Sequence, residues 1–331
     1  MTQPSGRATE PVNVQPAGVH APAEAHAPDV PAADDRPAVP PASGGLIGGL
    51  IREARPKQWV KNVLVFSAPA SAGVLFHATP LLQTIVAFIA FCLVASGTYF
   101  INDARDVEAD RVHVKKRFRP IAAGIVPVSL GYIGGAVLLA AGLAISFAVS
   151  WKLALVIGGY LVLTTAYSLW LKHEPVIDLV AVAAGFVLRA LAGAAATDIP
   201  TSSWFLVVVS LGSLFMVAGK REAELRNAAD DRKTRSTLQA YSIPFLNYVQ
   251  SASTGALLVA YSLWAFEGHT GLTRTLSGLS ILPFSVAILR YAMLVDTGRG
   301  EAPEDAVVSD RILIVCGLVL VLLVGVSVYV V

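Results

Sequence analysis

One asparagine and three aspartates recur at short intervals between residues 102 and 110. They are Asn102, Asp103, Asp106 and Asp110. If this segment is one continuous helix, all four side chains project within an arc of about 100°. Clustered carboxylates repel one another unless a cation is bound between them. The stripe therefore predicts metal ligands, whereas Glu108 and the basic residue after Asp110 point to other faces of the helix.

Oxygen ligands of this kind suit Mg²⁺, which proteins hold through one or two carboxylates together with substrate phosphates. A basic run follows closely and supplies counter-charges for phosphate oxygens: Lys115, Lys116, Arg117 and Arg119. Together the acidic stripe and the basic run predict a Mg²⁺-diphosphate site. The alternative is an ion-paired helix end that binds no ligand, but it does not explain the narrow acidic stripe.

The elements that must position these residues are membrane helices. Of the 331 residues, 55% are apolar and 15% are charged, which leaves too little polar surface for a water-soluble globule. Apolar stretches long enough to cross a bilayer predict an all-α membrane protein of about nine spans. We place them at 62-79, 81-101, 128-149, 152-171, 176-196, 203-219, 244-267, 276-295 and 311-331.

The start of the chain differs in composition from the rest. Residues 1-45 are rich in proline, alanine and acidic side chains and contain no apolar run, which predicts a disordered tail. The tail lacks the charged start, apolar middle and cleavage site of a signal peptide. The transmembrane domain is then residues 46-331. Cys92 and Cys316 fall inside predicted spans and indicate neither a disulfide nor a zinc site.

Basic residues gather in alternate connections between the predicted spans. They are concentrated before the first span and after the second and the sixth. By the positive-inside rule the N-terminus and these connections are cytoplasmic, and nine spans place the C-terminus outside. We therefore predict a multi-pass plasma-membrane protein with a cytoplasmic active site. Two long charged loops, 102-127 and 220-243, would cover that end of the bundle.

Other polar residues lie where predicted helices meet the cytoplasm. The segments RPKQWVKN at 55-62 and YSLWLK at 167-172 contribute the following candidates for substrate binding: Lys57, Lys61, Asn62, Tyr167 and Lys172. Lys57 equally fits an interfacial anchor whose ammonium reaches lipid headgroups.

Two ionisable residues, Asp178 and Arg189, lie inside the fifth predicted span. Intramembrane ionisable residues usually face a cavity and serve function. For Arg189, a substrate contact and a structural partner are equally supported. For Asp178, the structural interpretation is favoured.

The pattern N-D-x-x-D-x-x-x-D at 102-110, with K-x-x-R-P at 116-120, resembles the UbiA superfamily of intramembrane prenyltransferases. The resemblance extends through all nine predicted spans. It implies a helical bundle around a central cavity, with polar cap loops after the second and sixth helices. It also implies Mg²⁺ on a diphosphate, ligated by Asn102, Asp103, Asp106 and Asp110, with the three aspartates as the catalytic residues.

The region after the sixth span departs from the usual superfamily pattern, in which a second aspartate-rich motif binds another Mg²⁺. Here the sequence reads GKREAELRNAADDRKTRSTLQAY at 219-241, with Lys220 and Arg221 where the acidic motif would begin. The remaining acidic candidates for metal contact are Glu222, Glu224, Asp230 and Asp231. A predominantly basic cap favours a substrate that carries an additional phosphate.

With this basic cap, the motifs resemble the UbiA-type phosphoribosyltransferases that act on polyprenyl phosphates. That resemblance implies transfer of 5-phosphoribose from phosphoribosyl pyrophosphate (PRPP) to a polyprenyl phosphate such as decaprenyl phosphate, in the supply of cell-wall arabinan precursors. It makes the following residues candidates for binding the two substrates: Lys57, Lys61, Asn62, Lys116, Arg117, Arg119, Tyr167, Lys172, Arg189, Lys220 and Arg221. No nucleic-acid partner is expected, and the oligomeric state, a homo-oligomer included, stays open.

Two other functions fit part of this pattern. An ordinary prenyltransferase shares the fold and the first aspartate motif, but the basic replacement of the second motif counts against it. A transporter or lipid flippase would use intramembrane charges as a relay. Most charges here gather at one membrane face instead, which counts against transport.

Overall fold

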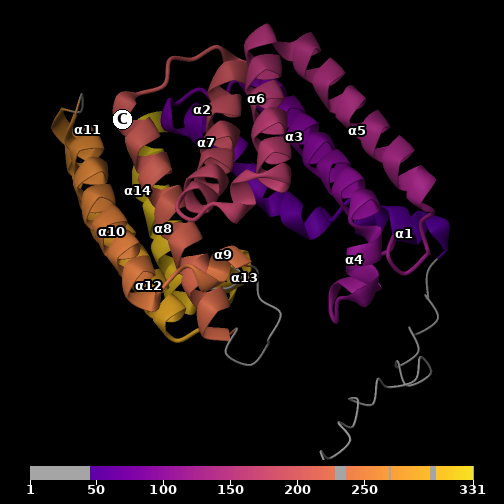
Figure 1. The fold of residues 1–331 in the computed structure, drawn as a ribbon. Helices are drawn as coiled ribbons and strands as arrows, with labels where there is room; N and C mark the ends of the chain where they lie inside the picture. Colours follow the sequence, from indigo (N-terminus) through magenta and orange to yellow (C-terminus); the bar gives the residue numbers. More distant parts are fainter. Residues whose placement is uncertain (1–44, 228–235, 268–269, 299–302, 331) are drawn as a thin grey trace, which may run out of the picture. The chain divides into compact units, whose positions relative to one another are not determined.

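The computed structural model describes residues 45–227, 236–267, 270–298 and 303–330. They all belong to one compact unit, Pro41–Val331. The described residues form helices joined by short connections and contain no strand (Figure 1). The predicted tail at 1-45 therefore lies almost entirely outside the described residues.

Seven helical segments are long and apolar enough to cross a membrane. They are α3 (Ala78–Arg105), α5 (Val128–Val149), α6 (Trp151–Leu169), α7 (Ile177–Thr197), α8 (Ser203–Asn227), α11 with α12 (Gly271–Leu279 and Ile281–Asp296), and α14 (Arg311–Tyr329). The all-α fold and the multi-pass membrane class are thus confirmed. The described residues supply seven such segments where the sequence predicts nine.

Predicted spans one and seven are not among these seven apolar segments, and the reasons are different. At 244-267 the chain forms α10 (Ile243–Phe266), a 24-residue helix whose first half is interrupted by polar side chains. At 62-79 it forms the 3₁₀ helix η1 (Pro56–Phe66) and the short α2 (Ser67–Ser71) instead of one α-helix. A 3₁₀ helix rises about 2.0 Å per residue, so η1 and α2 together measure roughly 30 Å, close to the thickness of a bilayer core.

Segment η1 packs against α7 and α3 in the largest apolar core. That core contains the fully buried side chains of Val65, Phe91, Leu153 and Ile157, contributed by η1, α3 and α6. Small residues on α7 admit the η1 backbone. A Cβ atom at Gly193 would lie only 1.9 Å from the Val65 carbonyl oxygen, so glycine is required at this position.

We expect Gly193→Ala to destabilise the fold by roughly 1–3 kcal/mol, because η1 must move away from α7. Gly158→Ala on α6 is the matched control, since nothing lies within 4 Å of its Cβ position. Thermal unfolding of both purified variants in detergent measures the difference. Equal unfolding temperatures would show that η1 is not packed tightly on α7.

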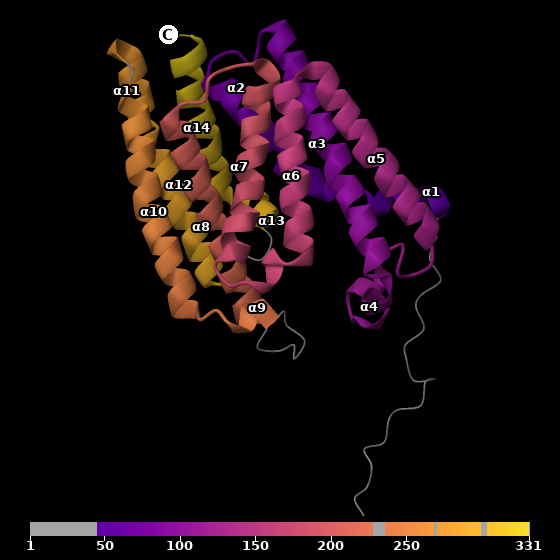
Figure 2. The same ribbon diagram turned by 45° about the horizontal axis from the view of Figure 1, so that its top comes forward.

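The shorter elements connect the long helices. They are α1 (Leu46–Glu53), α4 (Val107–Val112), η2 (Lys116–Phe118), η3 (Leu171–His173), α9 (Ser236–Gln239) and α13 (Pro303–Ser309). Figure 2 shows α4 and α9 at the same end of the long helices. The C-terminal ends of α3, α6 and α8 reach this end, and it carries most of the candidate site.

The two charged segments expected to be loops contain helices among their described residues. The segment predicted as a loop at 102-127 begins inside α3 and continues through α4 and η2. The second, at 220-243, begins inside α8, which extends to Asn227, includes α9 and ends at the start of α10. Asp230 and Asp231 lie outside the described residues.

Candidate active site

The acidic segment is not one continuous helix, so the assumption behind the predicted stripe is wrong. Helix α3 ends at Arg105, and α4 begins at Val107. Between them Asp106 has φ −91° and ψ 12°, outside the regular helical range. The four predicted metal ligands therefore occupy three separate environments.

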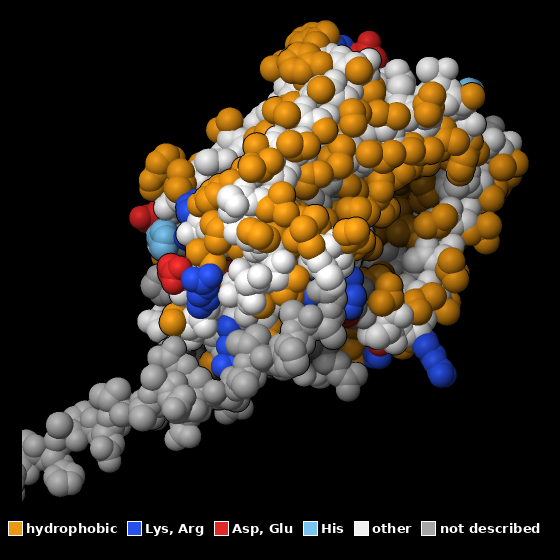
Figure 3. Space-filling view, turned by 90° about the vertical axis from the view of Figure 1, so that its right-hand side faces the viewer, with side chains coloured by type: hydrophobic (Ala, Val, Ile, Leu, Met, Phe, Trp, Pro, Cys, Tyr) orange, Lys and Arg blue, Asp and Glu red, His pale blue; other side chains and the backbone are white. Residues whose placement is uncertain are grey.

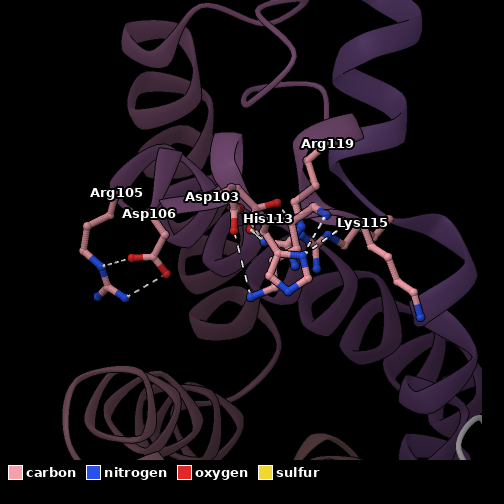
Figure 4. A network of polar contacts seen from close by, with 9 residues as sticks. Asp103, Arg105, Asp106, His113, Lys115 and Arg119 are labelled. Carbon is pink, nitrogen blue, oxygen red and sulfur yellow. Dashed lines mark hydrogen bonds and ion pairs between the residues drawn. The ribbon is translucent and has the colours of Figure 1, made fainter. Parts of the chain in front are cut away.

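Asp103 and Asp110 form the centre of one network, of which Figure 4 labels Asp103 and Arg119. Both are buried, with 4% and 3% of their surface exposed. Arg119 Nη1 donates to Asp103 Oδ1 at 3.0 Å and to Asp110 Oδ2 at 2.6 Å, so one guanidinium group bridges the two carboxylates. Lys116 Nζ lies 3.9 Å from Asp110 Oδ1, and Arg55 pairs with Asp103 from the other side.

Asp106 and Asn102 lie apart from this network. The Asp106 carboxylate pairs with Arg105, whose Nε lies 3.0 Å from Oδ1, and Figure 4 shows this pair turned away from Asp103. Asn102 Oδ1 accepts a hydrogen bond from Ser168 Oγ on α6 at 3.1 Å. Glu108 pairs with Arg111 outside this network, and its side chain is 80% exposed.

The described residues contain no cluster of three or more metal-ligating side chains in position to hold an ion. Mg²⁺ nevertheless needs only one or two carboxylates when substrate phosphates complete its coordination. Asp103 and Asp110 fit that requirement, because both already face one shared cation. Asn102 and Asp106 do not fit it in the observed arrangement.

Glu53 at the end of α1 is a buried acid beside the Asp103 network that the sequence interpretation missed. It is 1% exposed, and its carboxyl group lies beside Asp103 and the backbone of Ile121. Burial, reinforced by the neighbouring Asp103, raises the pKa of this carboxyl to about 8, although Arg55 opposes the shift. A single glutamate before a basic segment has no distinctive spacing, so the sequence offered no signal for it.

The raised pKa predicts a decline in stability with pH. Between about pH 4.5 and pH 8 the folded chain retains a proton on Glu53 that the unfolded chain releases. The free energy of unfolding therefore falls as pH rises through that interval. Glu53→Gln stays neutral throughout, so we expect it to unfold at a higher temperature than the wild type at pH 8 and at a similar one at pH 5. Parallel pH profiles for the two proteins would contradict this assignment.

A second ion-pair network joins α6, α7 and α8. Arg221 donates to both oxygens of the Asp178 carboxylate, through Nε at 2.8 Å and Nη2 at 2.9 Å. Tyr167 donates to Asp178 Oδ1 at 2.7 Å, and Arg221 Nη1 reaches Glu224 at 2.6 Å. Arg221, which the sequence placed among the substrate-binding candidates, is therefore buried in an ion pair that neutralises Asp178.

Glu222, another candidate for metal contact, belongs to a different network. Its carboxylate is 2% exposed and accepts from Arg226 at 2.6 Å and from Gln250 of α10. The contacts of Glu222 thus connect α8 to α10, away from the Asp103 network.

Arg189 lies among η1, α3, α6 and α7, in the largest core. Its Nε donates to Asn62 Oδ1 at 2.8 Å, Nη2 donates to Tyr160 Oη at 2.9 Å, and Nη1 donates to the Gly185 carbonyl at 2.7 Å. None of its contacts within the described residues is a carboxylate. The structure thus brings Arg189 together with Asn62, another predicted binding residue, and not with Asp178.

The other basic candidates are distributed over the same end of the bundle. Lys57 is exposed, Lys61 donates to Gln58 at 2.6 Å, and Lys172 is half-buried in η3. Arg117 lies over the Phe118 ring at 4.8 Å, and Lys220 lies 3.8 Å from Glu224. Lys220 thereby contacts the Asp178 network, because Glu224 also pairs with Arg221.

Apolar membrane helices that carry buried carboxylate and guanidinium groups at one end define a multi-span membrane protein with a polar site at the membrane boundary. The chain belongs to the UbiA prenyltransferase family, whose sequence pattern matches residues 63–316.

Within this family the chain is similar to proteins named decaprenyl-phosphate phosphoribosyltransferase. The relative from Corynebacterium glutamicum is 44% identical over 292 residues, covering 86% of this chain and 88% of the relative. The one from Mycobacterium tuberculosis is 44% identical over 294 residues, covering 87% and 96%.

The fold matches solved members of the family. A UbiA homologue from Archaeoglobus fulgidus, determined with GPP and Mg²⁺, superposes with a TM-score of 0.63 at 18% identity. The match covers 86% of this chain and all of that one. At this identity the likeness concerns the fold alone.

Proposed function

We propose that the chain transfers 5-phosphoribose from PRPP to a polyprenyl phosphate, with decaprenyl phosphate as the expected acceptor. The observation that supports this most strongly is the 44% identity to relatives named for that reaction, over most of both chains. The site agrees with it, because anionic substrates suit an end of the bundle that combines buried carboxylates with many cations.

Asp103 and Asp110 are the residues that would hold Mg²⁺ against the diphosphate of PRPP. Bound Mg²⁺ would neutralise the charge that develops on departing pyrophosphate. Arg119 and Lys116, which contact these carboxylates in the structure, are then available to phosphate oxygens. Asp106 would have to leave Arg105 before it could join them, as the family resemblance implies.

The reaction breaks the bond between ribose C1 and pyrophosphate, which leaves with the electron pair. A polyprenyl phosphate oxygen forms the new bond to C1. Positive charge develops on the ribose ring as the first bond lengthens, and the nearby carboxylates stabilise it electrostatically. The acceptor is already an anion and needs no strong general base. The chain's main task is to align two phosphorylated partners.

The proposed number and direction of membrane crossings rest on the lengths of the helices and on the distribution of basic residues. We propose that η1 with α2, and α10, complete nine crossings together with the seven apolar segments. The end that carries α4 and α9 would face the cytoplasm, where PRPP is available, and the C-terminus would be external. Figure 3 shows one face covered by hydrophobic side chains, with a hollow lined by them and Lys and Arg gathered near its lower edge. Such a hollow suits the hydrocarbon tail of the acceptor.

The proposal is tested by incubating the purified chain with ribose-labelled PRPP, a polyprenyl phosphate and Mg²⁺. We expect label to enter the lipid fraction only when both substrates are present. A parallel reaction offers labelled prenyl diphosphate and an aromatic acceptor, which an ordinary prenyltransferase would use. Transfer in the parallel reaction, without transfer from PRPP, would overturn the proposal.

A further inference from the structure

Arg55 stands out by its backbone conformation. Its φ of 52° and ψ of 58° lie in the left-handed region, which residues other than glycine seldom occupy. Backbone strain of this kind persists only where surrounding contacts enforce it, and it is concentrated at functional sites.

The contacts that enforce this conformation come from α3. Ser96 Oγ donates to the carbonyl oxygen of Ala54 at 2.8 Å, immediately before Arg55. The Trp59 indole N–H donates to the same Ser96 hydroxyl at 3.1 Å. The chain is therefore fixed to α3 on both sides of Arg55, which directs the Arg55 side chain toward Asp103.

The Arg55 guanidinium group is placed where a ligand can reach it. It pairs with Asp103 and lies over the Tyr99 ring, 4.4 Å from the ring centroid. The Arg55 side chain is 26% exposed, whereas that of Asp103 is 6% exposed. Arg55 is thus the accessible member of the pair, and stacking on Tyr99 holds its planar donor groups in a fixed orientation.

The charges around Asp103 indicate what that ligand is. Three cations, Arg55, Arg119 and Lys116, contact the two carboxylates of Asp103 and Asp110. If these carboxylates bind a divalent metal ion, they no longer neutralise the neighbouring cations, and the positive charge of Arg55 and Arg119 is balanced by another anion. Arginine binds phosphate oxygens through two parallel hydrogen bonds, so a diphosphate held by the same metal is the matching anion.

We propose that Arg55 is a substrate-binding residue that exchanges the Asp103 carboxylate for an oxygen of the donor's diphosphate. This inference rests on the proposed function and adds a residue to it. In the ligand-free chain, Arg55 keeps Asp103 neutralised. In the complex, Arg55 contacts the diphosphate directly, while Asp103 faces the metal.

The inference is tested by measuring the affinity for Mg²⁺-pyrophosphate by isothermal titration calorimetry on the full chain in detergent. The proteins are the wild type, Arg55→Gln, Asp103→Asn and the double variant. We expect each single change to weaken binding by about tenfold to one-hundredfold, because each removes a charged contact. If Arg55 and Asp103 contact the ligand separately, the double variant loses at least the product of the two single losses, because only the wild type must break the Arg55–Asp103 pair on binding.

A role through Asp103 alone gives a different result. In that case the double variant binds no more weakly than Asp103→Asn, and the inference is overturned. Unchanged affinity in Arg55→Gln, or a wild type that does not bind Mg²⁺-pyrophosphate, also overturns it. If Arg55→Gln does not fold, Arg55→Lys takes its place. Lysine keeps the charge but lacks the planar donors, so we expect the same loss of affinity for Mg²⁺-pyrophosphate.

Arg52→Gln is the matched control, because Arg52 is an exposed arginine on α1 three residues away. We expect its pyrophosphate affinity to equal that of the wild type. Unfolding temperatures without ligand separate weaker binding from loss of structure. If the wild type transfers phosphoribose and Arg55→Gln binds Mg²⁺-pyrophosphate normally, only the inference about Arg55 is overturned. If the wild type transfers no phosphoribose, the proposed function is overturned.

Discussion

Replacing Asp110 by asparagine is expected to lower the rate of phosphoribosyl transfer by about 10²- to 10³-fold, the range for loss of one preorganised charged group at a reacting centre. Asp110 is 3% exposed and shares the Arg119 guanidinium group with Asp103. The amide keeps the size of the side chain but removes the charge that a Mg²⁺-diphosphate requires. Initial rates at several Mg²⁺ concentrations measure the effect.

Glu108→Gln provides the control for this variant, since Glu108 lies two residues away on the same short helix. Its exposed carboxylate contacts only Arg111 among the described residues, at 2.8 Å. We expect its rate to stay within about twofold of the wild type, because exposed pairs contribute little. Equal losses in the two variants would mean that burial does not identify the functional carboxylate. Asp106→Asn, measured alongside, reports whether Asp106 leaves Arg105 during the reaction.

Replacing Arg221 by alanine is expected to destabilise the fold by about 3–5 kcal/mol, because it leaves a buried carboxylate without its cation. Asp178 is 2% exposed and receives both donors of the Arg221 fork. The loss should appear as a large fall in unfolding temperature in detergent, even without substrates. The effect is structural, so PRPP need not be present for it.

The double variant Asp178→Asn with Arg221→Met separates charge from packing. It removes both buried charges and should recover much of the lost stability, since an uncharged pair of similar volume avoids the desolvation cost. Lys220→Met, at a half-exposed neighbour, should leave the unfolding temperature nearly unchanged. If Arg221→Ala is as stable as Lys220→Met, the ion pair with Asp178 does not form.

Hydropathy predicted most of the membrane fold, because a long apolar run in lipid has few options other than a helix. The boundaries of α5 and α14 agree closely with the predicted spans at 128-149 and 311-331. The first span differed because hydropathy does not distinguish a 3₁₀ helix from an α-helix. Amino-acid composition also gives no indication of the tight contact between Gly193 and the Val65 backbone.

The sequence indicated which residue types gather at the candidate site but not how they are arranged. The spacing from Asp103 to Asp110 led to the prediction of a metal site beside basic residues, and the structure shows both carboxylates paired with Arg119. The prediction assumed one continuous helix. Because α3 ends at Arg105 and α4 begins at Val107, the four side chains do not share one helix face. The pairing of Arg55 with Asp103 and of Arg189 with Asn62 joins residues far apart in the chain. A single sequence contains no signal for such pairs, which follow from tertiary packing.

The most direct test of the account uses PRPP with two labels, one on the ribose and one on the β-phosphate. The purified chain is incubated with this donor, decaprenyl phosphate and Mg²⁺, and lipid and aqueous products are separated. Cleavage at ribose C1 predicts that the ribose label enters the lipid while the β-phosphate label is released as pyrophosphate, in equal amounts. A β-phosphate label in the lipid, or no ribose label there, would contradict phosphoribosyl transfer.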